Sequence, residues 1–280
     1  MPLFALVLVL TSALLHAIWN AIVKSGGDHL VAAWGTATGA AITALPMMGA
    51  TGLPSPGSLL FVGVSGVLHA LYNLALVRAY DHGDLSLVYP IARGIAPALA
   101  TAGAVVVYQE ALPAVAYTGI GLVTLGVLLI GESGRHVPMS RPAVLWSVLT
   151  AACIAAYTLV DRQGIRLTST TSYIMGLFWI NAVLLSFYVR VRRDAWPWRL
   201  VAPGRWGPLA VSGIFSLVAY LLVLLALSIS RVGYIAALRE TSVLIAAWVG
   251  WRHLGDPHGM PRLLSSAVVV AGLALLIAFR

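Results

Sequence analysis

The sequence predicts an all-α integral membrane protein with ten transmembrane helices, and composition, hydropathy and segment length carry this prediction. Of the 280 residues, 60% are hydrophobic and 9% are charged, whereas soluble domains carry about 25% charged residues. The mean hydropathy is +0.93. The apolar segments are continuous runs of about 20 residues, the length with which an α-helix crosses a bilayer. They lack the alternating pattern of a membrane β-barrel.

Short segments rich in glycine, proline or charge separate the predicted spans, as at residues 25–28 and 53–57. The N-terminus lacks the positive region of a cleaved signal peptide, so we expect it to open the first span. The single cysteine, Cys153, lies inside an apolar run, which predicts neither a disulfide framework nor a cysteine metal site. The predicted spans cover residues 2–23, 30–50, 58–80, 85–107, 113–131, 142–160, 171–190, 207–228, 232–251 and 261–279.

The net charge of +8 comes mainly from basic residues at span ends, where they orient a membrane protein rather than bind nucleic acid. Basic residues in and beside the odd-numbered loops outnumber those in the even-numbered loops and at the C-terminus. Because cytoplasmic loops carry the excess of basic residues, this predicts cytoplasmic odd-numbered loops and both termini outside the cell. The first group is Lys24, Arg78, Arg135, Arg141, Arg190, Arg192, Arg193, Arg199, Arg205, Arg252 and Arg262, and the second is Arg162, Arg166, Arg231 and Arg280.

The two halves of the chain resemble each other, so we expect two five-span repeats in one membrane domain, at residues 1–134 and 138–280. An offset of 146 residues aligns the glycine-rich ends of spans 5 and 10 and carries Arg93 onto Arg239. Near the start of each half the offset is 138 residues. Because five is odd, the halves would be inverted in the membrane. Inverted repeats are typical of transporters that bind substrate near the bilayer midplane.

A second similarity lies inside the first half, where spans 1 and 3 share the pattern His-Ala-aliphatic-aromatic-Asn. Residues three and four apart lie on one helix face. The two helices therefore present the same polar and aromatic face, and we expect both faces to line one cavity. The residues are His16, Trp19 and Asn20 in span 1 and His69, Tyr72 and Asn73 in span 3.

Three charged residues fall near the middle of spans 4 and 9: Arg93, Arg239 and Glu240. A charge at the bilayer centre costs from about 2.5 to more than 10 kcal/mol, so each is a functional candidate. One interpretation is a structural ion pair between Arg93 and Glu240. The other is that they face the cavity, where Arg93 binds a carboxylate or phosphate and Glu240 binds an ammonium group or carries a proton.

Aromatic residues within the spans are further candidates for the cavity lining, because their rings stack on planar groups and bind cations. Tyr89 lies four residues before Arg93 on one face of span 4, and Tyr234 and Trp248 share a stripe of span 9. Helix packing is the alternative role for each aromatic residue. For His16 and His69 the alternatives are hydrogen bonds between helices or a polar lining with proton coupling. The lining candidates are Trp19, Tyr72, Tyr89, Tyr157, Tyr234 and Trp248.

Span 4 also contains Pro90, Gly94 and Pro97. A proline inside a helix removes a backbone hydrogen bond and bends the helix, and freed carbonyls are tolerated where they face a cavity. We therefore expect these residues to form a hinge beside Arg93, with a static kink as the alternative.

These patterns resemble the drug/metabolite transporter superfamily, in its ten-span EamA-type branch, over nearly the whole chain. The resemblance is strongest in the His16–Lys24 opening, in Tyr157 to Asp161, and in the glycine ladder of span 5. Further matching residues are Pro90, Glu110, Gly119, Gly121, Gly126 and Gly164. The length of the chain and its aromatic, polar helix faces are similar to those of bacterial amino acid exporters, including the exporters of aromatic amino acids. Span 9 departs from the pattern, because it has no proline that matches Pro90 and carries Arg239 and Glu240 in its core instead. Relatives are often drawn with both termini cytoplasmic, in contrast to the orientation that the basic residues predict.

The resemblance implies a secondary transporter of the bacterial inner membrane that exports small organic metabolites by alternating access. Amino acids, aromatic ones included, are the expected substrates, and a substrate gradient or proton exchange would drive transport. The chain carries no Walker motif and no protease or hydrolase motif, so we expect no enzyme activity, cofactor or metal. The expected partners are a small-molecule substrate and the lipid bilayer, not nucleic acid, and a monomer would suffice.

Two alternatives remain at this stage. The first is transport of phosphorylated or phosphonate anions, with Arg93 and Arg239 as clamps. The second is an intramembrane enzyme acting on lipid-linked substrates, for which His253, Asp256 and His258 form the one suitable grouping.

Overall fold

The computed structural model describes residues 1–24, 28–83, 85–132, 140–245, 248 and 259–279, and every regular element in this part of the chain is helical. Eight of the described helices are long and apolar enough to cross a membrane. This confirms an all-helical membrane protein. The elements are α1 (Leu3–Lys24), α2 (His29–Thr51), η1 (Pro56–Ser58), α3 (Leu59–His82), α4 (Leu85–Tyr108), α5 (Ala114–Glu132), α6 (Arg141–Gly164), α7 (Thr170–Arg193), α8 (Pro197–Leu200), α9 (Trp206–Ile229), α10 (Val232–Leu238) and α12 (Gly259–Ala278).

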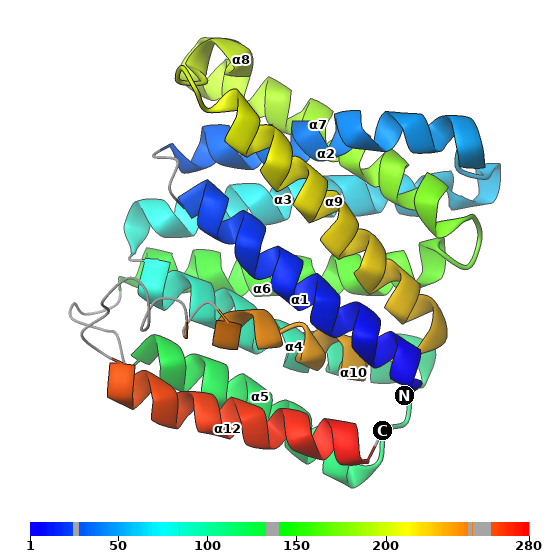
Figure 1. Ribbon diagram of the computed structural model, residues 1–280, viewed down its shortest axis with the longest axis vertical. Helices are drawn as coiled ribbons and strands as arrows, with labels where there is room; N and C mark the ends of the chain where they lie inside the picture. The colour runs from blue at the N-terminus through cyan, green and yellow to red at the C-terminus, as the bar shows by residue number, and fades with distance from the viewer. Residues whose placement is uncertain (25–27, 84, 133–139, 246–247, 249–258, 280) are drawn as a thin grey trace.

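The long helices run back and forth between two ends of the bundle, so the two chain termini lie at the same end (Figure 1). Helices distant in sequence are packed together. The main packing pairs are α1 with α9, α3 with α6, α2 with α7 and α9, α3 with α7, α4 with α5 and α6, and α5 with α12. The short α10 packs mainly against α4, in the middle of the molecule (Figure 1).

The outer surface of the bundle is apolar, as a lipid-facing surface requires. On α1, the large side chains of Leu3, Val7 and Leu14 are exposed and recur at helical spacing, while Val9 and Ser12 on the other face are buried. The Ser12 hydroxyl donates to the Ala219 carbonyl of α9 at 2.7 Å. Apolar residues therefore face outward and polar groups join helices inside.

Small residues let two helix pairs approach closely, which is how helices associate in membranes. On Gly213 of α9, an added methyl group would lie 2.5 Å from the backbone of Gly39 in α2. On Gly272 of α12, it would lie 2.6 Å from the Gly119 carbonyl oxygen of α5. Gly121 of the same span 5 ladder faces open space.

The structure differs from the predicted spans in one important place, span 9. The sequence predicts a continuous helix over 232–251, but α10 ends at Leu238, Arg239 and Glu240 form a turn, and residues 241–245 are helical again. At the turn, the Glu240 and Ser242 amides donate to carbonyls only three residues earlier. Conversely, α4 is a single helix in spite of Pro90 and Pro97. The interruption lies at the charged pair rather than at proline.

Candidate functional site

The interruption of span 9 places Glu240 against Arg93 of α4. The Arg93 Nε donates to Glu240 Oε2 at 3.2 Å, and Arg93 Nη2 lies 3.1 Å from Glu240 Oε1. Arg93 is 3% exposed and Glu240 is 2% exposed. Both carboxylate oxygens are therefore bound by one guanidinium group, in the two-pronged geometry that makes such pairs strong. Of the two interpretations that the sequence allows, the structure shows the ion pair between Arg93 and Glu240.

The turn also supplies a backbone acceptor to Arg93 of α4. The Arg239 carbonyl accepts hydrogen bonds from the Ser242 hydroxyl at 2.9 Å and from Arg93 Nη2 at 3.5 Å. Arg93 thereby joins α4 to both the side chain and the backbone of the turn. An irregular backbone at membrane depth is tolerated where protein groups satisfy it in this way.

Arg239 itself is buried, with 8% of its surface exposed. Its guanidinium carbon lies 5.6 Å from the centre of the Tyr220 ring of α9, within the range of a cation–π contact. No acidic side chain among the described residues pairs with it. The Arg239 side chain is thus a buried cation held by an aromatic face.

The sequence patterns did not single out Asp161 of α6 as a site residue, although its carboxylate is fully buried. Tyr173 Oη donates to Asp161 Oδ1 at 2.8 Å, and Tyr220 Oη donates to Asp161 Oδ2. A signal was available, because Asp161 lies four residues after Tyr157 and shares its helix face. Tyr220 joins this carboxylate to Arg239, since its hydroxyl bonds one and its ring contacts the other.

The His69 and Tyr72 side chains of the span 3 motif lie beside Tyr157 and Tyr220. The His69 ring stacks on Tyr157 with centroids 4.0 Å apart and meets the Tyr220 ring edge-on at 5.1 Å. His69 Nδ1 lies 2.9 Å from the Ser65 carbonyl oxygen, and Tyr72 meets Tyr157 edge-on at 6.0 Å. His69 is therefore part of an aromatic cluster built from α3, α6 and α9.

The span 1 motif meets α4 instead. Tyr89 Oη lies 3.4 Å from His16 Nε2, and the His16 and Trp19 rings meet edge-on at 4.9 Å. The Trp19 indole nitrogen is buried without a hydrogen-bond partner in the described part of the chain. A buried donor that lacks an acceptor within the protein is suited to a ligand acceptor.

The two motifs make the same local bond, as their shared pattern suggested. The Asn20 side chain donates to the His16 carbonyl at 2.8 Å, and the Asn73 side chain donates to the His69 carbonyl at 2.8 Å. Asn73 also donates to Asn181 Oδ1 of α7 at 3.4 Å. Each asparagine thus binds a backbone carbonyl of its own helix, and Asn73 also joins α3 to α7.

The two motifs do not touch each other in the contacts described above, but each is joined to the turn of span 9 through other side chains. His69 contacts Tyr220, whose ring faces Arg239. His16 lies against Tyr89 of α4, the helix that carries Arg93.

Two expected lining residues lie elsewhere. Tyr234 of α10 is buried, and its hydroxyl donates to the Phe279 carbonyl at the end of α12 at 3.1 Å. Trp248 is 53% exposed. The turn at Arg239 and Glu240 separates these two residues, so they do not form the single helical stripe that their spacing predicted.

The expected hinge residues are all buried inside α4. A methyl group added to Gly94 would lie 3.2 Å from Leu128 of α5, so Gly94 allows α4 and α5 to approach closely. The Thr101 hydroxyl donates to the Pro97 carbonyl at 2.7 Å. Movement about Pro90, Gly94 and Pro97 remains a prediction.

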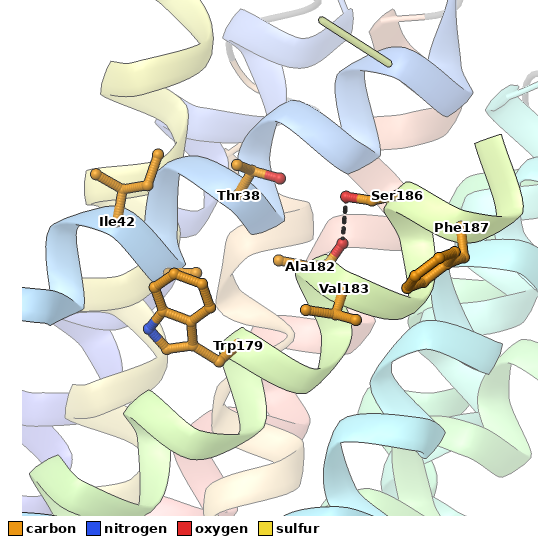
Figure 2. Close-up of a pocket in the computed structure, with 8 residues that line it drawn as sticks. Thr38, Ile42, Trp179, Ala182, Val183, Ser186 and Phe187 are labelled. Atoms are coloured by element: carbon orange, nitrogen blue, oxygen red, sulfur yellow. Dashed lines mark hydrogen bonds between the residues drawn. The ribbon is translucent and has the colours of Figure 1, made fainter. Parts of the chain in front are cut away.

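A separate groove of about 170 Å³ lies between α2 and α7, and Figure 2 shows its largely apolar lining. It contains none of the expected site residues. Its lining is Thr38, Ala41, Ile42, Trp179, Ala182, Val183, Ser186 and Phe187.

The enzyme alternative depends on His253, Asp256 and His258, which lie outside the described residues. Within the described residues, no group of three or more His, Cys, Asp or Glu side chains is arranged to hold a metal ion.

Comparison with known proteins finds an EamA-like transporter domain in the second half of the chain and a matching fold. Residues 141–278 match the model of the EamA-like transporter family. A solved crystal structure superposes with a TM-score of 0.77 at 17% identity, covering 97% of this chain and 95% of that chain. At this identity the likeness concerns the fold alone. No curated protein sequence matches the chain.

Proposed function

We propose that the protein exports small organic metabolites, above all amino acids, aromatic ones included. Residues 141–278 match the EamA-like transporter family, whose members are membrane transporters rather than enzymes. The substrate, the direction and the mechanism are our proposal. Export follows from the resemblance of the sequence to amino acid exporters.

The observation that carries the substrate proposal is the buried centre around the turn of span 9. It combines both signs of charge, in Arg93, Glu240 and Arg239, with the rings of Tyr157 and Tyr220. A zwitterion with an aromatic side chain needs such an environment, because charged groups require polar partners in a membrane and planar rings pack well on aromatic faces.

We further propose ten spans in two inverted repeats, at residues 1–134 and 138–280. The helix contacts support this, because contacts recur when each helix is replaced by its equivalent in the other half. With α1 equivalent to α6 and α3 to α9, the α1–α9 contact is equivalent to α6–α3. By the same rule α2–α9 is equivalent to α7–α3, and α4–α5 to α10–α12. In this scheme the interrupted α10 segment and α12 are spans 9 and 10, and the proposed boundary at residues 134–138 lies outside the described residues.

Transport in this proposal proceeds by alternating access. The two repeats move against each other around the buried centre, with Pro90, Gly94 and Pro97 as the hinge of α4. Discontinuous helices near the midplane are typical substrate sites in transporters of inverted-repeat design. The location is the bacterial inner membrane, and the driving force is a substrate gradient or proton exchange. One chain supplies both repeats, so a monomer is sufficient.

The test is uptake by sealed liposomes that contain the purified protein, with and without a pH gradient. The panel contains labelled phenylalanine, tryptophan, leucine, alanine and small phosphate and phosphonate anions. Saturable uptake of an amino acid, competed by its unlabelled form, is the expected result. Uptake of the anions alone, or of nothing in the panel by folded protein, would refute the amino acid proposal.

One observation favours anion transport as a second candidate. Arg239 has no acidic partner among the described residues, so the buried centre has a cation to offer to an anion. Arg93 is not free for the clamp that the sequence suggested, because Glu240 occupies it. Phosphate or phosphonate uptake in the same panel would select this candidate.

A further inference from the structure

We propose that Arg239 binds the carboxylate of the transported molecule and that Tyr220 keeps Arg239 available by holding Asp161 away from it. This assignment rests on the proposed function and names the substrate group that the site recognises. It also separates two roles that the sequence left together, an ion pair that fixes the fold and a cation that meets the substrate.

The first step is that Arg93 and Glu240 satisfy each other. Two nitrogens of Arg93 contact the two carboxylate oxygens of Glu240 at 3.2 and 3.1 Å. Arg93 Nη2 is also near the Arg239 carbonyl and the Ser242 hydroxyl, each at 3.5 Å. A substrate carboxylate that bound Arg93 would displace a buried carboxylate and leave Glu240 unpaired, which is strongly unfavourable.

The second step is that Arg239 lacks such a partner. Its guanidinium contacts the Tyr220 ring at 5.6 Å, and within the described part of the chain it has neither an ion pair nor a side-chain hydrogen bond. A ring face satisfies positive charge but accepts none of the five N–H donors in the usual geometry. A carboxylate is the acceptor group that matches these donors in pairs.

The one other buried acid near Tyr220 among the described residues, Asp161, does not neutralise the charge of Arg239. Asp161 is the buried acid on the other side of Tyr220, and both its oxygens are taken by hydroxyl groups. Tyr173 binds Oδ1 at 2.8 Å and Tyr220 binds Oδ2. These two hydrogen bonds hold the Asp161 carboxylate in place, and no ion pair joins it to Arg239 in the described part of the chain. Tyr220 therefore contacts both the Asp161 carboxylate and the Arg239 guanidinium and keeps the two apart.

The surroundings of Arg239 indicate an aromatic carboxylate. His69 and Tyr157 stack beside Tyr220, which provides faces for a planar ring. On the His16 side, the buried Trp19 indole N–H has no acceptor in the described part of the chain, which leaves it available to an acceptor of the ligand. The recognised molecule is thus a monocarboxylate with a ring attached, and an amino group is not required for this contact.

The experiment is equilibrium binding by calorimetry to the full-length protein in lipid nanodiscs. The probes are L-phenylalanine, 3-phenylpropanoate, which lacks the ammonium group, and 2-phenylethylamine, which lacks the carboxylate. The variants are Arg239→Gln, Arg239→Lys and Tyr220→Phe. Matched controls are Arg205→Gln, which removes a guanidinium at the end of the bundle, and Tyr188→Phe, which removes a hydroxyl from α7. Each variant is first checked for a single symmetric peak in size-exclusion chromatography.

In Arg239→Gln, the affinities for L-phenylalanine and 3-phenylpropanoate are expected to fall about 10- to 100-fold, the effect of losing a charged hydrogen-bond partner. Arg239→Lys retains part of the affinity because the charge remains without the paired donors. Tyr220→Phe weakens binding of both carboxylates, since Asp161 loses a hydrogen bond and can reach Arg239. Binding of 2-phenylethylamine does not weaken in Arg239→Gln, and the control variants match the wild type.

Equal affinity of wild type and folded Arg239→Gln for both carboxylates would overturn the assignment of Arg239. Failure of 3-phenylpropanoate and L-phenylalanine to bind the folded wild type would overturn it as well. The proposed function fails separately. If 3-phenylpropanoate binds in an Arg239-dependent manner but no amino acid is transported, the carboxylate site stands and the amino acid substrate does not. If Arg239→Gln transports phenylalanine like the wild type, the function stands and the site does not.

Discussion

At the scale of single residues, four charged side chains are buried in the part of the chain that the structure describes: Arg93, Asp161, Arg239 and Glu240. Three of them could be found from the sequence because they interrupt apolar runs near their middle. Asp161 lies near the end of its span, where charges are common, and so its burial was not predicted. Its partners come from α7 and α9, and such contacts depend on the tertiary fold.

The first prediction concerns the Arg93–Glu240 pair. Arg93→Met and Glu240→Met each leave one buried charge without its partner, and each is expected to lower the free energy of unfolding by about 3–5 kcal/mol. The double variant Arg93→Met/Glu240→Met removes both charges and is expected to recover most of this loss. Denaturant unfolding in detergent micelles measures all three variants. Additive losses in the double variant would show that the two side chains do not stabilise the fold as a pair.

At the scale of helices, the lengths of apolar runs predicted the elements well. The predicted span 113–131 corresponds to α5, Ala114–Glu132, and the predicted span 171–190 to α7, Thr170–Arg193. The interruption of span 9 was missed because the sequence has no proline there. Its cause is tertiary, since Arg93 of α4 contacts the Glu240 carboxylate and the Arg239 carbonyl. The prolines of α4 marked a helix that the structure shows as a single element.

The second prediction concerns helix packing between α5 and α12. In Gly272→Ala the new methyl group would lie 2.6 Å from the Gly119 carbonyl oxygen and 2.8 Å from the Val123 amide. Backbone atoms yield less readily than side chains, so we expect a loss of about 1–3 kcal/mol in unfolding free energy, typical of overpacking. Gly121→Ala is the matched control, because Gly121 faces open space. Equal stabilities of the two variants would contradict the packing described here.

At the scale of the whole molecule, the sequence predicted a helical membrane protein and its family, and the fold and the family match bear this out. The two five-span repeats could be proposed from weak similarity between the halves of the sequence, such as the constant offset that aligns Arg93 with Arg239. The substrate could not be derived, because recognition depends on which side chains pair within the protein and which remain available. Arg93 and Arg239 look alike in sequence, yet one is paired with Glu240 and the other is not.

The third prediction concerns orientation. Both chain ends lie at one end of the bundle (Figure 1), and Tyr234 near the start of α10 bonds the Phe279 carbonyl. The distribution of basic residues predicts that these ends lie outside the cell. Fusions of an alkaline phosphatase reporter to either end are expected to be active, and fusions of a cytoplasmic fluorescent reporter to be dark. Fluorescence of both cytoplasmic fusions, without phosphatase activity, would reverse the orientation.

The measurement that tests the central claim most directly is counterflow in liposomes that contain the purified protein. Liposomes are loaded with unlabelled phenylalanine and diluted into buffer with a trace of labelled phenylalanine. A carrier with alternating access exchanges one molecule for another, so the label is expected to accumulate transiently above its equilibrium level and then decline. Folded protein that takes up no label, or that only lets it equilibrate without this overshoot, would contradict the account of a phenylalanine carrier.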